Sequence, residues 1–256
     1  MRDRAQRILE ELFRTGSLSV EQISAQFGIS IATVRRDLEA LEQQGRLRRT
    51  HGGAIAVEPL LYEPFRHDSS FQEQIDCRAE EKRRIAMAAA ELIADGETIA
   101  LTAGTTTTQV TRSIPPRKGL TVVTNTVNIA MELSRRKDIG VLVTGGFLRG
   151  DWFSLVGQPA IQTVNQLALD KMFIGVNGID PAWGLTTFNP DEAAINRAMA
   201  SRAKQRIVVA DHTKLGVSAT YQFWDIDHID HLFTDSGASD EAVAPYLERR
   251  IEVHRV

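Results

Sequence analysis

The chain has 256 residues, which suits one large domain or two unequal ones, and its 43% hydrophobic and 25% charged residues are typical of a globular protein. The single cysteine, Cys77, excludes an internal disulfide, and no Cys/His group has the spacing of a zinc site. No apolar run approaches the roughly 20 residues that cross a bilayer, and the first residues lack a signal-peptide pattern. The sequence therefore predicts a cytoplasmic protein that does not bind membranes.

The net charge of −3 is unevenly distributed along the chain. Residues 1–57 carry nine arginines and seven acidic residues, whereas the remainder carries 21 basic and 26 acidic residues. Within 45–53, Arg46, Arg48 and Arg49 stand without any acidic residue. This asymmetry indicates an N-terminal segment that meets a polyanion and a larger body with a different role.

Two helices are predicted in the first 28 residues. In the first, over 4–14, the apolar residues recur at helical spacing: Ile8, Leu9, Leu12 and Phe13. Ser19 and Gln22 have the spacing of a capping box, so a second helix is expected to begin after Ser19 and to end at Gly28.

A third helix is predicted from Ser30, a plausible N-cap, to about Gln43. Its expected buried stripe consists of Ile31, Val34, Leu38 and Leu41. A short turn after Gly28 joins the second helix to the third, which is typical of a helix-turn-helix motif. The segment that follows predicts a two-stranded wing over 46–49 and 54–57.

The outer face of the third helix carries Thr33, Arg35 and Arg36 near its start, where a recognition helix presents side chains to base edges. The arginines of the wing are placed to contact phosphates. His51, in the turn of the wing, could contact a phosphate or be an ordinary turn histidine. The alternative is a protein-interaction module with a solvated arginine edge. The candidate DNA-binding residues are Ser30, Thr33, Arg35, Arg36, Arg46, Arg48, Arg49 and His51.

The residues from Ile29 to Leu38, together with Gly45 and the run 51–54 (His-Gly-Gly-Ala), closely resemble the N-terminal signature of DeoR-type bacterial transcriptional regulators. The resemblance implies that the chain binds operator DNA through a winged helix-turn-helix, usually as a repressor. Asp37 is acidic, and we expect it to pair with an arginine or to support the helix rather than to contact DNA.

After a predicted linker over 58–78 and a helix over 78–94, short apolar strands alternate with helical segments. Strands are expected at 98–102, 120–124, 140–144, 171–176, 206–210, 231–234 and 251–254. Helices are expected near 106–114, 126–137, 158–168, 191–204 and 239–249. This alternation predicts an α/β domain with a mostly parallel sheet covered on both faces, and with ligands beyond the carboxyl ends of its strands.

The loop after the first of these strands has the composition of an anion-binding helix start. Gly104 permits a close backbone approach, and the hydroxyls and free amides of Thr105, Thr106 and Thr107 suit a phosphate. A plain helix cap is the alternative. The loop is not a nucleotide P-loop, because its Gly-Lys-Ser/Thr ending is absent.

Polar residues and glycines also follow the other predicted strands or begin a helix. Lys214 could pair with a phosphate or with Asp211, and Glu192 at a helix start is electrostatically favourable without any ligand. Because the loops share one edge of the sheet, we expect a common pocket. Its further candidate residues are Asn125, Gly145, Gly146, Asn177, Gly178, Glu192, Asp211 and Lys214.

The same body resembles the C-terminal sensor domain of DeoR-type regulators, which is similar in fold to ribose-5-phosphate isomerase. The resemblance rests on the Gly104–Thr107 run, the run 173–179 and the run 210–214 (Ala-Asp-His-Thr-Lys). It implies that 79–256 binds a phosphorylated sugar effector and forms homo-oligomers. Family members often have an acidic residue and a serine where this chain has Thr102 and Ala103, which affects the expected contacts to effector hydroxyls.

The sequence thus predicts a repressor of a sugar-metabolism operon with a winged helix-turn-helix at 1–57, acting as a dimer or tetramer, without enzymatic activity or cofactor. The rival is a sugar-phosphate isomerase with an appended DNA-binding domain, in which Asp211 or Glu192 would be the base. No metal site is expected, since Asp225, Asp227 and Asp230 and the histidines near them are irregularly spaced.

Overall fold

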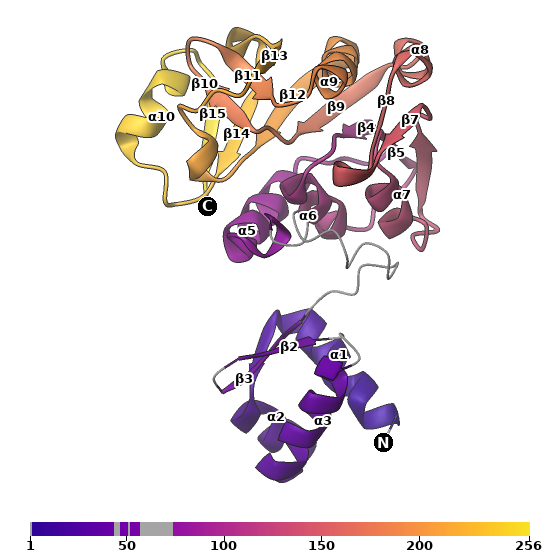
Figure 1. Cartoon of the computed structure of the whole chain (residues 1–256), viewed down its shortest axis with the longest axis vertical. Coiled ribbons are helices and arrows are strands. Elements are labelled where there is room, and N and C mark those ends of the chain that lie inside the picture. The colour runs from indigo at the N-terminus through magenta and orange to yellow at the C-terminus, as the bar shows by residue number, and fades with distance from the viewer. Residues whose placement is uncertain (1, 44–46, 51, 57–73) are drawn as a thin grey trace. The chain divides into compact units, whose positions relative to one another are not determined.

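The computed structural model of the chain describes residues 2–43, 47–50, 52–56 and 74–256. The chain forms two compact units, Met1–His67 and Asp68–Val256, each described here by itself (Figure 1). The boundary between them falls inside the segment predicted as a linker, most of which lies outside the described residues. Within the described ranges, no helix is both long and apolar enough to cross a membrane.

The first unit is a winged helix. Its elements are α1 (Arg2–Thr15), β1 (Ser17–Ser19), α2 (Val20–Phe27), α3 (Ile31–Gln43), β2 (Leu47–Thr50) and β3 (Gly53–Ala56). The strands form an antiparallel sheet in the order β1-β3-β2. The three helices and the β2–β3 wing were predicted from the sequence, whereas the three-residue β1 was missed.

Local hydrogen bonds fix the ends and the packing of α2 and α3. The predicted capping box is present, since Gln22 N donates to Ser19 Oγ at 3.1 Å and Ser19 N donates to Gln22 Oε1 at 2.7 Å. The Asp37 carboxylate accepts two hydrogen bonds from the Arg4 guanidinium, at 2.7 and 2.9 Å, which confirms its predicted pairing with an arginine. This two-point contact fixes α1 against α3.

The core of the winged helix contains most of the apolar residues predicted to face inward, but Ile31 is not among them. Ile31 is 43% exposed, so its placement on the buried stripe of α3 was wrong. It is the first residue of the helix and lies before the turn that contacts the core. The buried residues are Ile8, Leu9, Leu12, Leu18, Val20, Ile23, Val34, Leu38, Leu41, Leu47 and Ala54.

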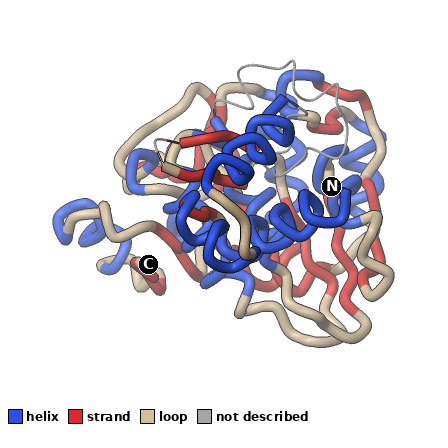
Figure 2. Tube along the Cα trace, turned by 90° about the horizontal axis from the view of Figure 1, so that it is seen from below, coloured by secondary structure: helices blue, strands red, loops and turns tan. Residues whose placement is uncertain are grey.

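The second unit is built on a seven-stranded sheet in which every pair of neighbouring strands is parallel. Its strands are β4 (Thr98–Leu101), β5 (Leu120–Thr124), β6 (Ile139–Val143), β9 (Leu169–Ile174), β12 (Ala203–Val209), β14 (His231–Thr234) and β15 (Glu252–Arg255). The strand order is β15-β14-β12-β9-β4-β5-β6. All seven strands were predicted, and they alternate with helices along the chain. Figure 2 draws the strands in red and the helices in blue.

Helices cover both faces of this sheet, as predicted (Figure 1). Successive strand residues point to opposite faces, so Ile99 and Leu101 pack with α5, α6 and α7 whereas Ala100 packs with the other helices. The helices are α5 (Ala79–Ala90), α6 (Thr105–Ser113), α7 (Val127–Leu133), α8 (Gln158–Asn165), α9 (Pro190–Arg202) and α10 (Asp240–Leu247). The predicted helices are thus present, with ends that differ by a few residues.

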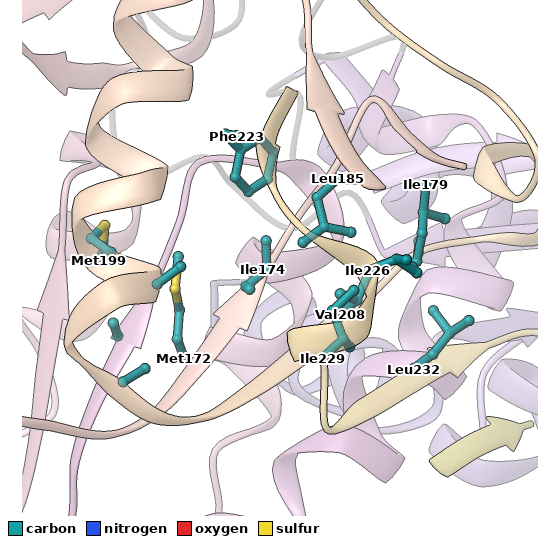
Figure 3. Packing of buried hydrophobic residues seen from close by; sticks show 14 of the residues in the cluster. Met172, Ile174, Ile179, Leu185, Met199, Val208, Phe223, Ile226, Ile229 and Leu232 are labelled. Carbon is teal, nitrogen blue, oxygen red and sulfur yellow. The ribbon is translucent and has the colours of Figure 1, made fainter. Parts of the chain in front are cut away.

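Smaller elements that the sequence did not reveal complete this unit. They are the hairpin β7 (Phe147–Arg149) and β8 (Ser154–Val156), the antiparallel sheet β10 (Gly178–Asp180), β11 (Gly184–Thr187) and β13 (Tyr221–Trp224), and the 3-10 turns η2 (Gly150–Trp152), η3 (His212–Lys214) and η4 (Ile226–His228). Leu185 and Phe223 of the small sheet belong to the same apolar cluster as Ile174, Val208 and Leu232 of the large sheet (Figure 3).

Candidate functional site

A polar pocket, partly open to solvent, lies beyond the carboxyl ends of β4, β5, β9 and β12. From β4 the chain adds β5 and β6 on one side, and then returns to place β9 on the other side. The boundary between β4 and β9 is therefore the point at which the strand order reverses. Ligands of open α/β sheets bind at such a switch point.

The loop from β4 to α6 forms one wall of the pocket. Gly104 is the N-cap of α6, and its φ of 149° is a conformation that only glycine adopts readily. No side-chain cap occupies the start of the helix. The hydroxyls of Thr107 and Thr108 donate to Gly104 O at 2.9 and 2.8 Å, which fixes the loop. Thr105 and Thr106 line the pocket at the start of the helix, where free backbone amides and the helix dipole favour an anion.

Two lysines line the pocket, Lys82 of α5 and Lys214 of η3. Lys82 is 3% exposed, and its ammonium donates to Gln74 O. Burial lowers the pKa of Lys82 below its ordinary value, against the opposing effect of the nearby Asp211 carboxylate. Among the described residues, Lys214 has no carboxylate within salt-bridge distance. The structure therefore does not contain the ion pair between Lys214 and Asp211 that the sequence left open.

Asp211 lines the pocket but is engaged by its own loop. Its Oδ1 accepts hydrogen bonds from the Thr213 amide at 3.1 Å and from the Thr213 hydroxyl, and it caps η3. The Arg78 guanidinium lies 4.0 Å from the same oxygen. Asp211 therefore orients the loop that carries Lys214 and places a negative charge beside the Lys82 ammonium.

A second group of polar side chains lies around Glu192 on α9. Glu192 Oε1 accepts from Ser154 Oγ at 2.9 Å. Thr187 Oγ1 lies 3.3 Å from Glu192 Oε2 and 2.9 Å from Asn177 Oδ1, so it links the two side chains. Asn196 lies one turn further along α9 and also lines the pocket. These groups are suited to hydroxyls of a ligand, since they offer both acceptors and donors.

Asn125, at the end of β5, has one partner and one unsatisfied atom. Its Nδ2 donates to Leu155 O at 3.4 Å, whereas its buried Oδ1 has no hydrogen-bond partner. A buried acceptor without a partner is costly. Because Asn125 lines the pocket, a ligand hydroxyl or a water molecule could satisfy this oxygen.

The structure brings together most of the predicted pocket residues. Those that line it are Gly104, Thr105, Thr106, Asn125, Asn177, Glu192, Asp211 and Lys214. Sequence reasoning missed Lys82, Gln74, Trp152, Thr187 and Asn196, which also line it. Of these, Lys82 had a readable signal, because it shares the buried stripe of α5 with Ile85, Ala86 and Ala89.

Four residues predicted to line the pocket do not line it. Thr107 is fully buried and its hydroxyl is used within the loop. Gly145 and Gly146 lead from β6 into the hairpin strand β7. Gly178 begins β10, where a Cβ would lie 2.1 Å from Val217 O, so it serves a close approach of two backbones.

Replacing Gly178 with alanine is therefore expected to destabilise the fold by about 1–3 kcal/mol, because the backbone must move to admit the methyl group. Urea unfolding measures this loss. Gly150→Ala is the matched control, since no atom lies within 4 Å of its would-be Cβ. Equal stability of the two variants would contradict the assignment of Gly178 to backbone packing.

The predicted DNA-contacting residues lie around α3 of the winged helix. Arg35 and Arg36 are exposed and form no ion pair with any described residue. Arg35 lines a shallow groove with Arg49 and Thr50 of β2. Ser30 caps α3, since Thr33 N donates to Ser30 Oγ at 3.3 Å, and the two hydroxyls are 2.9 Å apart.

The wing arginines differ in their surroundings. Arg49 Nε lies 3.4 Å from Glu42 Oε2, a contact between two half-exposed side chains that a phosphate could displace. Arg48 is exposed on β2. Arg46 and His51, which were also predicted to contact DNA, lie outside the described residues.

A winged helix with an arginine-bearing helix face, joined in one chain to an α/β unit with a polar pocket, defines a ligand-responsive transcriptional regulator. Residues 4–59 match the DeoR-like helix-turn-helix domain, and residues 77–236 match the DeoR C terminal sensor domain. The chain belongs to the DeoR family of transcriptional regulators.

Similar curated proteins include the HTH-type transcriptional regulator GlpR of Haloferax volcanii, at 38% identity over 91% of this chain and 89% of that protein. Another is the glycerol-3-phosphate regulon repressor of Escherichia coli strain K12, at 31% identity over 90% of this chain and 88% of that protein. Among solved structures, ribose 5 phosphate isomerase A of Neisseria gonorrhoeae gives a TM-score of 0.39 at 18% identity over 52% of each chain, a likeness on which nothing here depends.

Proposed function

We propose that this regulator is a repressor of a sugar-metabolism operon, that it binds operator DNA through residues 1–57, and that a phosphorylated sugar in the pocket of 79–256 controls it. The observation that carries the proposal is the composition of the pocket: the start of α6 and two lysines lie at the switch point of the sheet. The function would place the protein in the cytoplasm, where the operator DNA lies.

The DNA-binding part rests on charge and geometry. Arg35 and Arg36 lie in the first half of α3, the part of a recognition helix that contacts bases, and Arg48 and Arg49 lie on the wing. Ser30 and Thr33 stand at the start of α3, where hydroxyls and amides suit a phosphate. Arg46 and His51 remain predicted contacts from the sequence.

The effector-binding part divides the pocket by chemistry. A phosphate is suited to the amides at Thr105 and Thr106 and to the ammonium groups of Lys82 and Lys214. The sugar hydroxyls are suited to the acceptors and donors around Glu192 and to the unsatisfied oxygen of Asn125. The name of the glycerol-3-phosphate regulon repressor supports a phosphorylated effector for a relative.

We further propose that the protein is not an isomerase. Isomerisation requires a base at a sugar carbon, and the carboxylates lining the described pocket are Glu192 and Asp211. Glu192 is held by Ser154 and Thr187, and Asp211 is held by Thr213. Both carboxylates are thus already engaged by neighbouring groups. Absence of turnover with pentose and hexose phosphates is the expected result.

A homo-oligomer, dimer or tetramer, follows from the DNA-binding role, because operators usually carry two half-sites that mirror the symmetry of the protein. The effector must then bind one arrangement of the oligomer better than another, since a ligand with equal affinity for both cannot change the affinity for DNA.

The experiment that tests the proposal uses the full-length protein and an operator duplex selected from random sequence. Binding should weaken steeply with salt, and one phosphorylated sugar should change the affinity by about 5- to 150-fold, the usual range of coupling. The unphosphorylated sugar is the matched control and should have no effect. If no duplex shows salt-sensitive binding, the DNA-binding part is wrong; if no phosphorylated sugar changes that binding, the effector part is wrong.

A further inference from the structure

A cluster of two histidines and one glutamate lies on the last two strands of the large sheet. β14 and β15 pair in parallel, with His231 opposite Glu252 and Phe233 opposite His254. Because side chains alternate along a strand, His231, Glu252 and His254 all project from the same face. β15 is the edge strand of the sheet, beside β14 near the C-terminus (Figure 1).

The nitrogen atoms of the two histidines and the carboxylate oxygens of Glu252 lie close together. His231 Nδ1 lies 3.3 Å from His254 Nε2. The Glu252 carboxylate places Oε2 3.4 Å from His231 Nδ1 and Oε1 3.4 Å from His254 Nε2. One ligand atom from each of the three residues thus lies within 4.8 Å of the other two.

These separations also suit ligands that share one metal ion. N–H donors approach their acceptors at about 2.9–3.0 Å in most protein hydrogen bonds. In a tetrahedral zinc site, bonds of about 2.0–2.1 Å to nitrogen and about 2.0–2.2 Å to oxygen place neighbouring ligand atoms about 3.3–3.5 Å apart. The separation between the two imidazole nitrogens, and the separation from each nitrogen to one oxygen of the Glu252 carboxylate, fall in this range.

The surroundings hold the imidazoles in place while leaving the site accessible. The His254 ring stacks on Phe233, with ring centroids 4.1 Å apart and planes at 8°, which fixes its orientation. The side chain of His231 is 13% exposed, whereas that of Glu252 is 65% exposed. An ion can therefore enter from the side of Glu252.

We propose that His231, Glu252 and His254 bind a divalent transition-metal ion, with Zn²⁺ as the first choice, because two imidazoles and one carboxylate suit zinc better than magnesium or calcium. Glu252 and His254 lie beyond residues 77–236 that match the sensor-domain family model, so membership of the family does not assign this site. The sequence predicted no metal binding by Asp225, Asp227, Asp230 and the neighbouring histidines, which include His231; the proposed site differs in taking its other two ligands from β15.

The ion would join β14 to β15 and thereby hold the edge strand in the sheet. Unfolding separates the two strands and destroys the site, so the metal stabilises only the folded state. At a free Zn²⁺ concentration of about 100 times the dissociation constant, the melting temperature should rise by roughly 5–10 °C for a protein of this size. A chelator should reverse the rise.

Isothermal titration of untagged full-length protein with Zn²⁺ tests the site. The expected result is one ion per chain, with affinity lowered at least about 10-fold in Glu252→Gln and in His254→Ala, since even residues that support ligands cost 10–100-fold when removed. His228→Ala is the matched control, because His228 is an exposed histidine outside the cluster. Its Zn²⁺ affinity should equal that of the wild-type protein.

Glu252→Gln is the decisive variant, because its side chain is exposed and its replacement leaves the fold intact. Co²⁺ gives a second readout, since the visible absorption of a four-coordinate ion should appear in the wild type and be lost in this variant. Absence of Zn²⁺ binding to the wild-type protein, or equal binding by the wild type and Glu252→Gln, would overturn the proposal. Neither outcome bears on DNA or effector binding.

Discussion

Replacing Arg35 and Arg36 together with alanine is expected to abolish specific retention of operator DNA by the full-length protein. Each base-reading arginine contributes about 1–3 kcal/mol, so a single replacement should weaken binding by roughly 5- to 150-fold. Both side chains are exposed on α3 and form no ion pair with a described residue, so their removal leaves no partner unsatisfied. Fluorescence anisotropy with a labelled operator measures the loss.

The single variants separate base readout from phosphate contact. An arginine that reads a base should relax specificity at one operator position, whereas a phosphate contact such as that expected for Arg49 should weaken binding to all sequences and reduce the salt slope by about 1. Arg135→Ala is the control, because Arg135 is an exposed arginine of the sensor unit and its loss changes the net charge equally. The free energy of unfolding should change by less than about 0.5 kcal/mol in each variant.

Unchanged operator binding by the double variant would favour the alternative reading of residues 1–57 as a protein-interaction module. In that case the arginine face of α3 would be a solvated surface. A loss of binding accompanied by a large fall in the unfolding free energy would instead indicate that the arginines support the fold, which their exposure argues against.

The strands of the large sheet could be predicted because a parallel sheet buried on both faces requires short apolar runs such as Ile99–Leu101 and Val122–Val123. The strands that were missed, such as β1 and β10, have three residues each and are too short to show a period. β1 is specified by its pairing with β3, whose residues lie far along the sequence from it.

The sequence predicted the edge of the sheet at which the pocket lies, but it did not predict the order of the strands along that edge. Glycines after any strand of a parallel sheet lie at the same edge, which is why Gly145 was expected beside Gly104. In the sheet β6 is the outermost strand, two places from β4, so its loop lies away from the switch point between β4 and β9. Strand order results from packing of the whole domain and leaves no local pattern in the sequence.

The burial of Lys82 could be read from the sequence, but its position at the pocket could not. Its spacing from Ile85 and Ala89 places it on the buried stripe of α5, where a charged residue is unexpected unless it has a partner or a function. The sequence alone does not place α5 at the pocket, because that depends on the approach of α5 to the loop after β12. The structure brings the Lys82 ammonium near Asp211 and Lys214, which lie far from Lys82 in the sequence.

Replacing Lys82 with methionine is expected to weaken effector binding while stabilising the protein. Loss of a charge-assisted contact to a phosphate costs about 1.5–3 kcal/mol, which corresponds to roughly a 10- to 150-fold higher effector concentration for the same change in DNA binding. Thermal-shift titration with the phosphorylated sugar that emerges from the operator experiment measures the affinity. The unliganded variant, in contrast, should unfold at a higher urea concentration than the wild type near neutral pH.

The gain in stability follows from the pKa of Lys82. Burial lowers this pKa in the folded protein below the ordinary 10.5, so the unfolded chain binds the proton more tightly. At pH values below the folded pKa, the charged Lys82 side chain therefore lowers the free energy of unfolding. This loss disappears as the pH rises from the folded pKa towards 10.5. The wild-type protein should gain stability through that interval relative to Lys82→Met, and the two unfolding free energies should converge at alkaline pH.

Lys214→Met is the matched control for this experiment. Lys214 also lines the pocket but is only partly buried, so its replacement should weaken effector binding without the pH-dependent gain in stability. Asp211 retains the Thr213 amide and hydroxyl as partners in both variants, so neither replacement leaves its carboxylate unsatisfied. If Lys82→Met binds the effector as the wild type does, the phosphate does not contact this ammonium. If Lys82→Met is instead less stable than the wild type near neutral pH, the buried lysine stabilises the fold. That result would contradict the stability change expected from the lowered pKa of Lys82.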